Sequence, residues 1–370
     1  MDPFIRVAMF PTPRSDDPWM KEMRPFLLII ANELEKIGCS CVPTPKRMTM
    51  VWVLKNRKKI DVIHLHWPEK QYEFDWVNLP ISFPGSNRIK KALGILWLIL
   101  MVNLLKIIKI PIVWTIHDIF PHSSQNPSRM QIFARKYLLK NVAVVLLNCK
   151  GIESLIQKSL GVPKKVVVSP LGDYKDFYQN TISRIDARKY LNLGENDLMF
   201  LFFGTQRPHR NALSLTDAFK ELGNEKTCLW VVGNTDIKLR QSIEKKCWGT
   251  WNIHLYLNLV TNDQLECLIK ATDFVVMPGK NYLTSAVIVL ALSYGKPVIT
   301  PNYGCAPTMV NNAGILYAEA EDWKPLLSAL KDAINQRETL TNLAEKQMNS
   351  WSWAETAKNI KQAYLLSLNN

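Results

Sequence analysis

Short apolar runs alternate with segments of helical character along the whole chain. In the first half the apolar runs cover residues 5–10, 39–43, 62–67, 110–116, 142–148 and 165–170. The helical segments between them cover residues 20–37, 87–108, 127–140 and 151–160. Apolar runs separated by helices indicate a parallel sheet that is covered on both faces.

The same pattern starts again in the second half. Here the apolar runs cover residues 198–204, 227–233, 251–257, 274–279 and 296–301. In the segment between the first two runs, apolar residues recur at spacings of three and four, which predicts the core face of a helix: Leu215, Ala218, Phe219 and Leu222. The sequence "TNDQ" from Thr261 predicts a capping box at the start of a further helix.

The restart of the pattern predicts an α/β protein of two doubly wound, Rossmann-like domains. The stretch "PLGDYKDFYQN" interrupts the periodicity, so we expect domains at residues 1–172 and 173–350, followed by a final helix at 351–370. In doubly wound sheets, ligands bind outside the carboxyl ends of the strands. The chemistry is therefore to be sought in loops that follow strands.

Composition supports two domains and adds a charge asymmetry. The chain has 370 residues, of which 47% are hydrophobic, and a formal net charge of +14. Residues 1–172 hold 25 Lys and Arg against 12 Asp and Glu, whereas residues 173–370 hold 21 against 20. The basic first half would attract nucleic acid, a phosphorylated substrate or an anionic membrane surface, and a solvated basic face is the alternative.

Two basic clusters account for much of this excess. The first is formed by Lys55, Arg57, Lys58 and Lys59, and the second by Arg88, Lys90 and Lys91 before a long apolar stretch. That stretch is too short to span a bilayer, so it predicts a buried helix or, alternatively, a helix that rests on an anionic leaflet. The first residues lack the pattern of a secretory signal, and we expect a cytoplasmic protein, with peripheral attachment to the inner face of the membrane as a hypothesis.

Several kinds of chemistry lack their motifs. No Gly-x-Gly-x-x-Gly follows the first strand and no P-loop occurs, which sets aside dehydrogenases and P-loop phosphotransferases. The seven cysteines lack metal-site spacing and there is no Asp-x-Asp, so we expect neither a metal nor a cofactor. His64 and His66 share one face of a strand but, without a third ligand, indicate packed histidines.

Two loops after strands of the second half carry anion-binding features. In "FFGTQRPHRN", Gly204 permits close approach of a ligand, and Arg207 and Arg210 offer forked donors that suit phosphate oxygens. Thr284 and Ser285 stand where a helix begins and would hold an anion there. Surface arginines near a turn and simple N-capping are the alternative interpretations.

The order of several segments resembles the nucleotide-sugar domain of GT-B glycosyltransferases, in the broad group that includes glycosyltransferase family 4. These segments are "FFGTQRPHRN", "VVGN", "LYLNLVTNDQLECLIKATDFVVMPG" and "LALSYGKPVITP". Further stretches, "DVIHLHWPE", "WTIHDIFPH" and "SWSWAETAKNIKQAY", are similar to a bacterial subgroup that builds capsular and exopolysaccharides, with β-mannosyltransferase-like members.

The resemblance implies a hexosyltransferase whose two domains face each other across a cleft. It would move a sugar from a GDP- or UDP-linked donor to a saccharide acceptor, lipid-linked in capsule or exopolysaccharide biosynthesis, without a metal. In this resemblance Arg207 and Arg210 grip the donor diphosphate, Val260 meets the base, and His117 faces the donor sugar. Thr284 and Ser285 approach the β-phosphate, and the final helix crosses back onto the first domain.

One departure concerns stereochemistry. Tyr282, which we count among the donor-binding residues, and Leu290 stand where retaining members of family 4 often carry two glutamates, so retention cannot be assumed. An inverting reaction needs a carboxylate that takes the proton of the acceptor hydroxyl. Asp17, Glu69 and Asp118 are the candidates, with Asp16 beside the first of them.

Two other functions are compatible with these features. A GT-B-like epimerase would use similar phosphate contacts without a sugar acceptor. A basic nucleic-acid-binding protein would explain the charge of the first half. However, that half lacks a recognisable nucleic-acid-binding module. The loop that contains Arg207 and Arg210, which we call the arginine loop, lies in the nearly neutral half. We therefore expect a nucleotide sugar, a saccharide acceptor and an anionic membrane surface as partners, and no nucleic acid.

Overall fold

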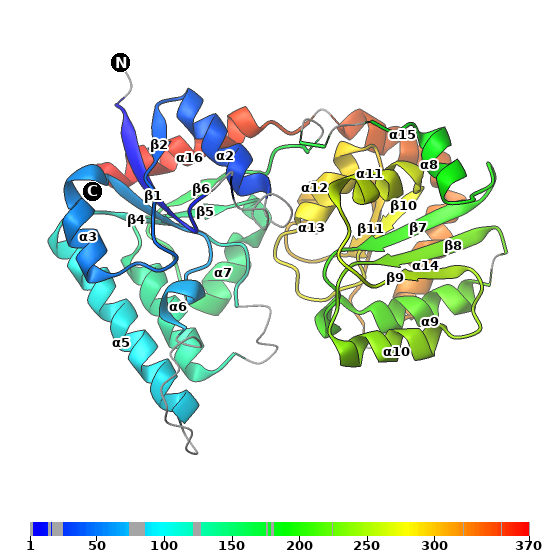
Figure 1. Ribbon diagram of the computed structural model, residues 1–370, viewed down its shortest axis with the longest axis horizontal. Coiled ribbons are helices and arrows are strands. Elements are labelled where there is room, and N and C mark those ends of the chain that lie inside the picture. The colour runs from blue at the N-terminus through cyan, green and yellow to red at the C-terminus, as the bar shows by residue number, and fades with distance from the viewer. Residues whose placement is uncertain are drawn as a thin grey trace. The chain divides into compact units, whose positions relative to one another are not determined.

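The computed structural model divides the chain into two compact units (Figure 1). Unit 1 comprises Met1–Pro170 and Trp353–Asn370, and unit 2 comprises Leu171–Ser352. The described residues are 3–13, 16, 25–73, 86–120, 127–174, 177–178, 181–223, 225–320, 322–348 and 350–369. Each unit contains a parallel sheet of six strands with helices between the strands, which confirms the predicted α/β class.

The sheet of unit 1 has the strand order β2-β1-β3-β4-β5-β6, and all its neighbouring strands are parallel. Its strands are β1 (Ile5–Phe10), β2 (Cys39–Cys41), β3 (Val62–Leu65), β4 (Ile112–Thr115), β5 (Val144–Leu147) and β6 (Val166–Val168). The chain runs outward from β1 to β2 and then returns to β3. The order therefore reverses between β1 and β3, which is where ligands bind in open α/β sheets.

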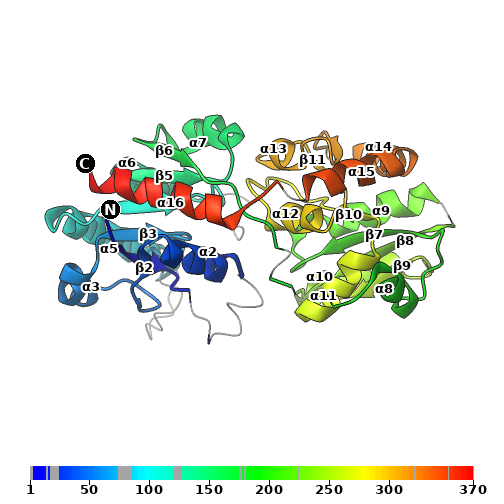
Figure 2. The same cartoon turned by 90° about the horizontal axis from the view of Figure 1, so that it is seen from above.

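Two helices from opposite ends of the chain lie side by side on one face of this sheet (Figure 2). They are α2 (Pro25–Lys36) and α16 (Trp353–Leu368), and their apolar side chains share one core with β1, β3, β4 and β5. The remaining helical elements of unit 1 are α3 (Met50–Asn56), η1 (Arg57–Lys59), α4 (Glu69–Tyr72), α5 (Ser86–Ile107), α6 (Arg129–Asn141), η2 (Lys150–Ile152) and α7 (Glu153–Leu160).

Helix α5 is buried along one side only. Leu98, Met101, Val102 and Leu105 are at most 4% exposed. The opposite side presents five large apolar residues that are 45–78% exposed, which we call the α5 stripe: Ile89, Leu93, Leu96, Leu100 and Ile107. The expectation of a plain buried helix is therefore wrong for this side, because the helix is apolar on more of its circumference than its neighbours, α4 and α6 among them, cover. Within the described residues, no helix combines the length and apolarity that crossing a membrane requires.

The sheet of unit 2 has the order β12-β11-β10-β7-β8-β9, also with parallel neighbours. Its strands are β7 (Leu198–Phe203), β8 (Thr227–Val232), β9 (Ile253–Tyr256), β10 (Phe274–Val276), β11 (Val298–Pro301) and β12 (Gly314–Tyr317). The order reverses between β7 and β10. Strand β12 was not predicted, because its apolar run, Ile315–Tyr317, is only three residues long and its four residues are half-buried in an edge strand.

Helices cover both faces of the second sheet (Figure 1). On one face lie α9 (Ala212–Leu222), α10 (Ile237–Cys247) and α14 (Lys324–Asn335), and on the other α8 (Arg184–Tyr190), α11 (Asn262–Ala271) and α12 (Ala286–Ser293). The shorter η3 (Pro208–Arg210) and α13 (Ala306–Val310), and α15 (Arg337–Gln347), complete the unit. As predicted, Leu215, Ala218 and Phe219 enter the core, and Thr261 and Gln264 form a capping box.

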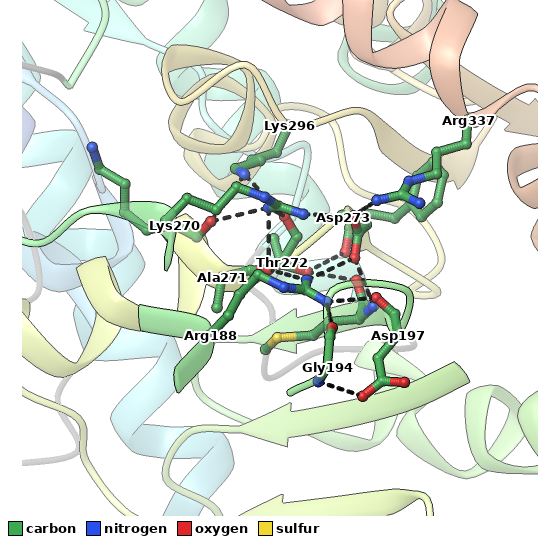
Figure 3. Close-up of polar contacts among 12 residues, drawn as sticks. Arg188, Gly194, Asp197, Lys270, Ala271, Thr272, Asp273, Lys296 and Arg337 are labelled. Atoms are coloured by element: carbon green, nitrogen blue, oxygen red, sulfur yellow. Dashed lines mark hydrogen bonds and ion pairs between the residues drawn. The ribbon is translucent and has the colours of Figure 1, made fainter. Parts of the chain in front are cut away.

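One buried carboxylate braces unit 2 at the amino ends of β7 and β10 (Figure 3). Asp273 Oδ1 accepts hydrogen bonds from Arg184 at 2.7 Å and Arg337 at 2.8 Å, and Oδ2 accepts from Arg188 at 3.3 Å and the Met199 amide at 2.8 Å. These contacts join α8, α15 and β7 to the start of β10. Parallel strands share their direction, so their amino ends lie together and their carboxyl ends lie together. The brace is therefore at the opposite end of the strands from the loops that follow β7 and β10.

A half-buried lysine, Lys296, lies beside this brace. Lys296 Nζ donates to the carbonyl oxygens of Lys270 at 3.1 Å and Thr272 at 2.9 Å, where α11 ends. A cation suits the carbonyl end of a helix dipole. Nevertheless, burial, and then the charge of Arg184, lower the pKa of Lys296 to about 7.

Candidate active site

The loops after β7 and β10 meet at the point where the strand order of unit 2 reverses. Arg210 Nε donates a hydrogen bond of 2.9 Å to the Tyr282 hydroxyl, and the Lys280 amide donates one of 3.1 Å to the His209 carbonyl oxygen. The His209 and Tyr282 rings are also in edge contact, with centroids 6.0 Å apart. The structure therefore brings together two predicted donor-binding residues, Arg210 and Tyr282, that lie 72 positions apart in the chain.

Gly204 provides the space that Arg210 occupies. Its φ is 107°, and a Cβ at this position would lie 2.2 Å from Arg210 Nη1. That nitrogen donates to the Thr205 carbonyl oxygen at 3.2 Å, and the guanidinium lies 5.4 Å from the Phe202 ring centroid. Arg207 is exposed, and its side chain makes no hydrogen bond with any residue in the described ranges. Arg210 is thus held in place, while Arg207 is available to a ligand.

Thr284 and Ser285 differ in what their hydroxyl groups do. Ser285 is the N-cap of α12, and its Oγ accepts a hydrogen bond of 3.2 Å from the Val287 amide. The N-capping interpretation is therefore sufficient for Ser285. Thr284 Oγ1, in contrast, is buried and lacks a hydrogen-bond partner among the described residues.

Val260 lies outside this group. It follows the edge strand β9, two strands away from β7, and is half-buried directly before the capping box of α11. Its predicted contact with a nucleotide base stays a prediction.

In unit 1, histidines gather at the carboxyl ends of β3 and β4. A hydrogen bond of 3.0 Å joins His66 Nδ1 to His117 Nε2, and the two rings are stacked. His64 is fully buried, and hydrogen bonds join its two ring nitrogens to Tyr364 at 2.8 Å and Thr115 at 2.7 Å. Burial, and then the charge of His117, lower the pKa of His64 to about 3, so this ring is neutral and serves in packing.

Glu69 is engaged in a buried ion pair. Arg135 Nη2 donates to Glu69 Oε2 at 2.9 Å, and its Nη1 donates to the Asp118 carbonyl oxygen at 2.8 Å. The side chains of Arg135 and Glu69 are 3% and 8% exposed. Arg135 thus connects two of the candidate bases and supports the loop of His117. Asp17, the third candidate, lies outside the described residues.

Sequence reasoning missed Arg135. Its signal was a single arginine on the apolar side of α6, where Ala134, Leu138 and Leu139 are buried with it. A buried arginine requires a partner for its charge, so a carboxylate in a neighbouring loop was to be expected.

The predicted basic residues lie at the surface of unit 1. Lys55 lies in the last turn of α3, and η1 consists of Arg57, Lys58 and Lys59. All four side chains are exposed. In α5, Lys91 is exposed and Lys90 is half-exposed, whereas the side chain of Arg88 is outside the described set. Across the ranges that the structure describes, no group of three His, Cys, Asp or Glu residues has the geometry of a metal site.

Comparisons with known proteins agree with this arrangement. The family described as "Glycosyl transferases group 1" matches residues 183–349, which contain the loops after β7 and β10. A GDP-mannose:glycolipid 4-beta-D-mannosyltransferase of Xanthomonas campestris pv. campestris is 23% identical over 287 residues, which are 75% of this chain and 72% of that protein.

Solved structures share the fold over nearly the whole chain. Sucrose-phosphate synthase from Thermosynechococcus elongatus has a TM-score of 0.73 at 14% identity, and 98% of each chain is covered. Anabaena HepE in complex with UDP-glucose has a TM-score of 0.70 at 15% identity, and 99% of each chain is covered. These similarities confirm the GT-B fold.

Proposed function

We propose that the protein transfers a hexose from a nucleoside-diphosphate sugar to a saccharide acceptor, because residues 183–349 match the family "Glycosyl transferases group 1" and the chain has the GT-B fold. The observation that carries this proposal is the position of Arg207 and Arg210. Both belong to the loop after β7, at the reversal of strand order beside the N-terminus of α12.

The loop after β7 and the start of α12 offer complementary contacts to a diphosphate. The Arg207 side chain has no competing hydrogen bond in the described part of the chain, and a guanidinium suits phosphate oxygens. The amide groups at the N-terminus of α12 add positive potential. Together they would stabilise the negative charge that develops on the leaving nucleoside diphosphate.

We propose that this transfer requires no divalent metal, since arginines and a helix N-terminus take over the neutralisation of the diphosphate. Turnover in the presence of EDTA is the direct measurement. Activity within about twofold of the untreated enzyme supports the proposal, and a loss that added Mg²⁺ or Mn²⁺ restores contradicts it.

For the acceptor we propose that unit 1 supplies the group that takes the proton from the attacking hydroxyl. Glu69 is poorly suited to this role, because Arg135 binds its carboxylate in a buried site. His117 and Asp118 therefore become the preferred candidates among the described residues. Asp17 keeps its place as a prediction from the sequence.

The acceptor is, in our proposal, a lipid-linked saccharide of bacterial capsule or exopolysaccharide biosynthesis. Support comes from the similarity to an enzyme whose name specifies a glycolipid acceptor and GDP-mannose as donor. UDP-linked sugars are included as possible donors, because Anabaena HepE, which has the same fold, was solved in complex with UDP-glucose.

We further propose that unit 1 binds the inner face of an anionic membrane. The α5 stripe is exposed and apolar, and Lys91 on α5 and the cluster at residues 55–59 add exposed positive charge to the same unit. Apolar side chains that enter the interface and cations that meet anionic lipids both favour such binding.

Co-sedimentation with vesicles of phosphatidylcholine, with or without phosphatidylglycerol, measures this attachment. We expect binding that requires phosphatidylglycerol and that falls at least about tenfold in Leu96→Gln/Leu100→Gln, because two apolar side chains are lost from the interface. Val162→Gln is the matched control, since Val162 is 77% exposed in unit 1 outside the α5 stripe. Equal binding of all three proteins would contradict the attachment proposal.

The transfer itself is tested with a panel of GDP- and UDP-linked hexoses and glycolipid acceptors. Formation of a glycosylated product, identified by mass spectrometry, supports the proposal. Hydrolysis or epimerisation of a bound donor without any glycosidic product would replace it by the epimerase alternative.

A further inference from the structure

A pocket opens beside the N-terminus of α12, entirely within unit 2. The pocket is open to solvent, with about 260 Å³ of empty space that includes the adjoining solvent, and it is lined from the loops after β10, β11 and β12. Its polar lining residues are Tyr282, Thr284, Ser285, Thr300, Tyr303 and Glu319. The pocket therefore adjoins Arg210 through Tyr282, but its own lining residues include no cation.

Glu319 is the only ionised group among the lining residues of this pocket. It follows β12, and its Oε1 accepts a hydrogen bond of 3.1 Å from the Asn281 amide. This bond anchors the loop at Asn281, whose φ is 60°. The other carboxylate oxygen makes no hydrogen bond within the described part of the chain, so it is available to a ligand.

The charge of Glu319 acts on two phenols nearby. Burial is the main cause of the raised pKa of Tyr303 and of Tyr317, and the Glu319 carboxylate raises both further. Both phenols therefore stay protonated at neutral pH, and Tyr303, which lines the pocket, can donate a hydrogen bond there. Together with the unpaired Thr284 Oγ1, the pocket combines a carboxylate with several hydroxyl groups.

This combination suits a sugar rather than a phosphate. A carboxylate accepts strong hydrogen bonds from the hydroxyl groups of a hexose, whereas it repels the oxygens of a diphosphate. Arg207 and Arg210 have the opposite preference. The two sets of residues would thus orient one donor molecule, with its diphosphate at the arginine loop and its hexose in the pocket.

We propose that Glu319 recognises the donor hexose through its hydroxyl groups and that Thr284 completes this subsite. The inference rests on the proposed function and deepens it. It assigns the recognition of the donor hexose to Glu319, which follows β12 and lies outside both the arginine loop and the loop before α12. Sequence reasoning did not select Glu319, which lies in "AEAEDW" among other acidic residues.

Isothermal titration of the full-length protein with nucleotide sugars and with the corresponding free nucleotides separates hexose recognition from diphosphate recognition. GDP-mannose with GDP, and UDP-glucose with UDP, are the probes. Glu319→Gln keeps an oxygen that can accept from the Asn281 amide but removes the charge. For this variant we expect roughly tenfold weaker binding of the nucleotide sugar, the loss typical of a charge-assisted hydrogen bond, and binding of the free nucleotide within about twofold of wild type.

Two further variants control this experiment. Asp322→Asn removes an exposed carboxylate three positions away and should change neither affinity. Thr284→Val should weaken nucleotide-sugar binding selectively, like Glu319→Gln. The inference is overturned if Glu319→Gln binds the sugar donor like wild type, or if it loses sugar donor and free nucleotide equally, which indicates a role in anchoring the loop. If wild type binds free nucleotides but none of the sugar donors, the proposed function itself fails.

Discussion

Arg210 Nε and the Tyr282 hydroxyl lie 2.9 Å apart, and this hydrogen bond joins the loops after β7 and β10. It links the arginine loop to the segment that precedes α12 and lines the Glu319 pocket. Tyr282 stands where retaining relatives often carry a glutamate. Here a phenol, rather than a carboxylate, is the partner of the arginine, so the full positive charge of Arg210 remains available to the donor.

Replacing Tyr282 by Phe should test this relationship. The variant keeps the ring against Arg210 and His209 but removes the acceptor of the Arg210 Nε hydrogen bond. We expect kcat/KM for the donor to fall about 10- to 100-fold, since a hydrogen bond to a charged group contributes about 1.5–3 kcal/mol. Steady-state kinetics at saturating acceptor measures this, and an unchanged kcat/KM would show that the bond has no part in positioning Arg210.

Alanine at position 207 should reduce turnover at least about 100-fold without loss of folding, because the exposed Arg207 stabilises charge on the leaving group rather than the fold. Circular dichroism and the melting temperature verify the fold of the variant. Lys331→Ala, which removes an exposed cation on α14, is the control and should retain wild-type turnover. Near-normal transfer by Arg207→Ala would refute the diphosphate role.

Removal of one partner of the Arg135–Glu69 pair should destabilise unit 1. Arg135→Leu leaves the buried Glu69 carboxylate without its cation, and we expect a loss of about 3–5 kcal/mol. The double variant Arg135→Leu/Glu69→Leu should recover part of this loss, because no charge then stays buried alone. Thermal unfolding measures both variants.

Lys136→Leu serves as the control for this series. Lys136 is the exposed neighbour of Arg135, and its replacement should shift stability by less than about 0.5 kcal/mol. A double variant less stable than Arg135→Leu alone would argue against an unpaired carboxylate as the cause.

Lys296 should make the stability of unit 2 depend on pH. Its pKa is lowered from 10.5 to about 7 in the folded protein, so between these values the unfolded chain holds a proton that the folded chain lacks. Stability therefore rises with pH across this window and carries the full penalty below about pH 7. Lys296→Met removes this titration. The difference in melting temperature between wild type and Lys296→Met should grow in favour of wild type from pH 7 to 9, and a constant difference would contradict the lowered pKa.

The alternation of apolar runs and helices was sufficient to predict both sheets, because buried parallel strands appear in the sequence as continuous apolar runs. β7 was predicted in this way, since all six of its residues are buried. β12 was not predicted, because its apolar run, Ile315–Tyr317, is only three residues long and all four strand residues are half-buried. Helix α5 was predicted as a helix, but its exposed stripe was not, because an apolar helix has the same sequence pattern whether or not its second side is covered.

The residue types at the candidate site were also readable from the sequence, since glycine and paired arginines after a strand indicate anion binding. Which of their atoms are available depends on partners from distant elements. The sequence alone did not show that Arg135 forms an ion pair with Glu69. Nor did it show that Ser285 caps α12 while the Thr284 hydroxyl has no hydrogen-bond partner among the described residues. The position of Glu319, after β12 in the pocket lined by Tyr282, was likewise visible only in the structure.

The succession of strands and helices along the chain and the residue types in the loops were thus determined by the local sequence, because they depend on spacing and residue type. The assignment of each charged group to packing or to ligand binding is decided by tertiary structure. A carboxylate or hydroxyl is free for a substrate only where folding brings no other donor or acceptor within hydrogen-bond distance, and that condition depends on residues far apart in the sequence.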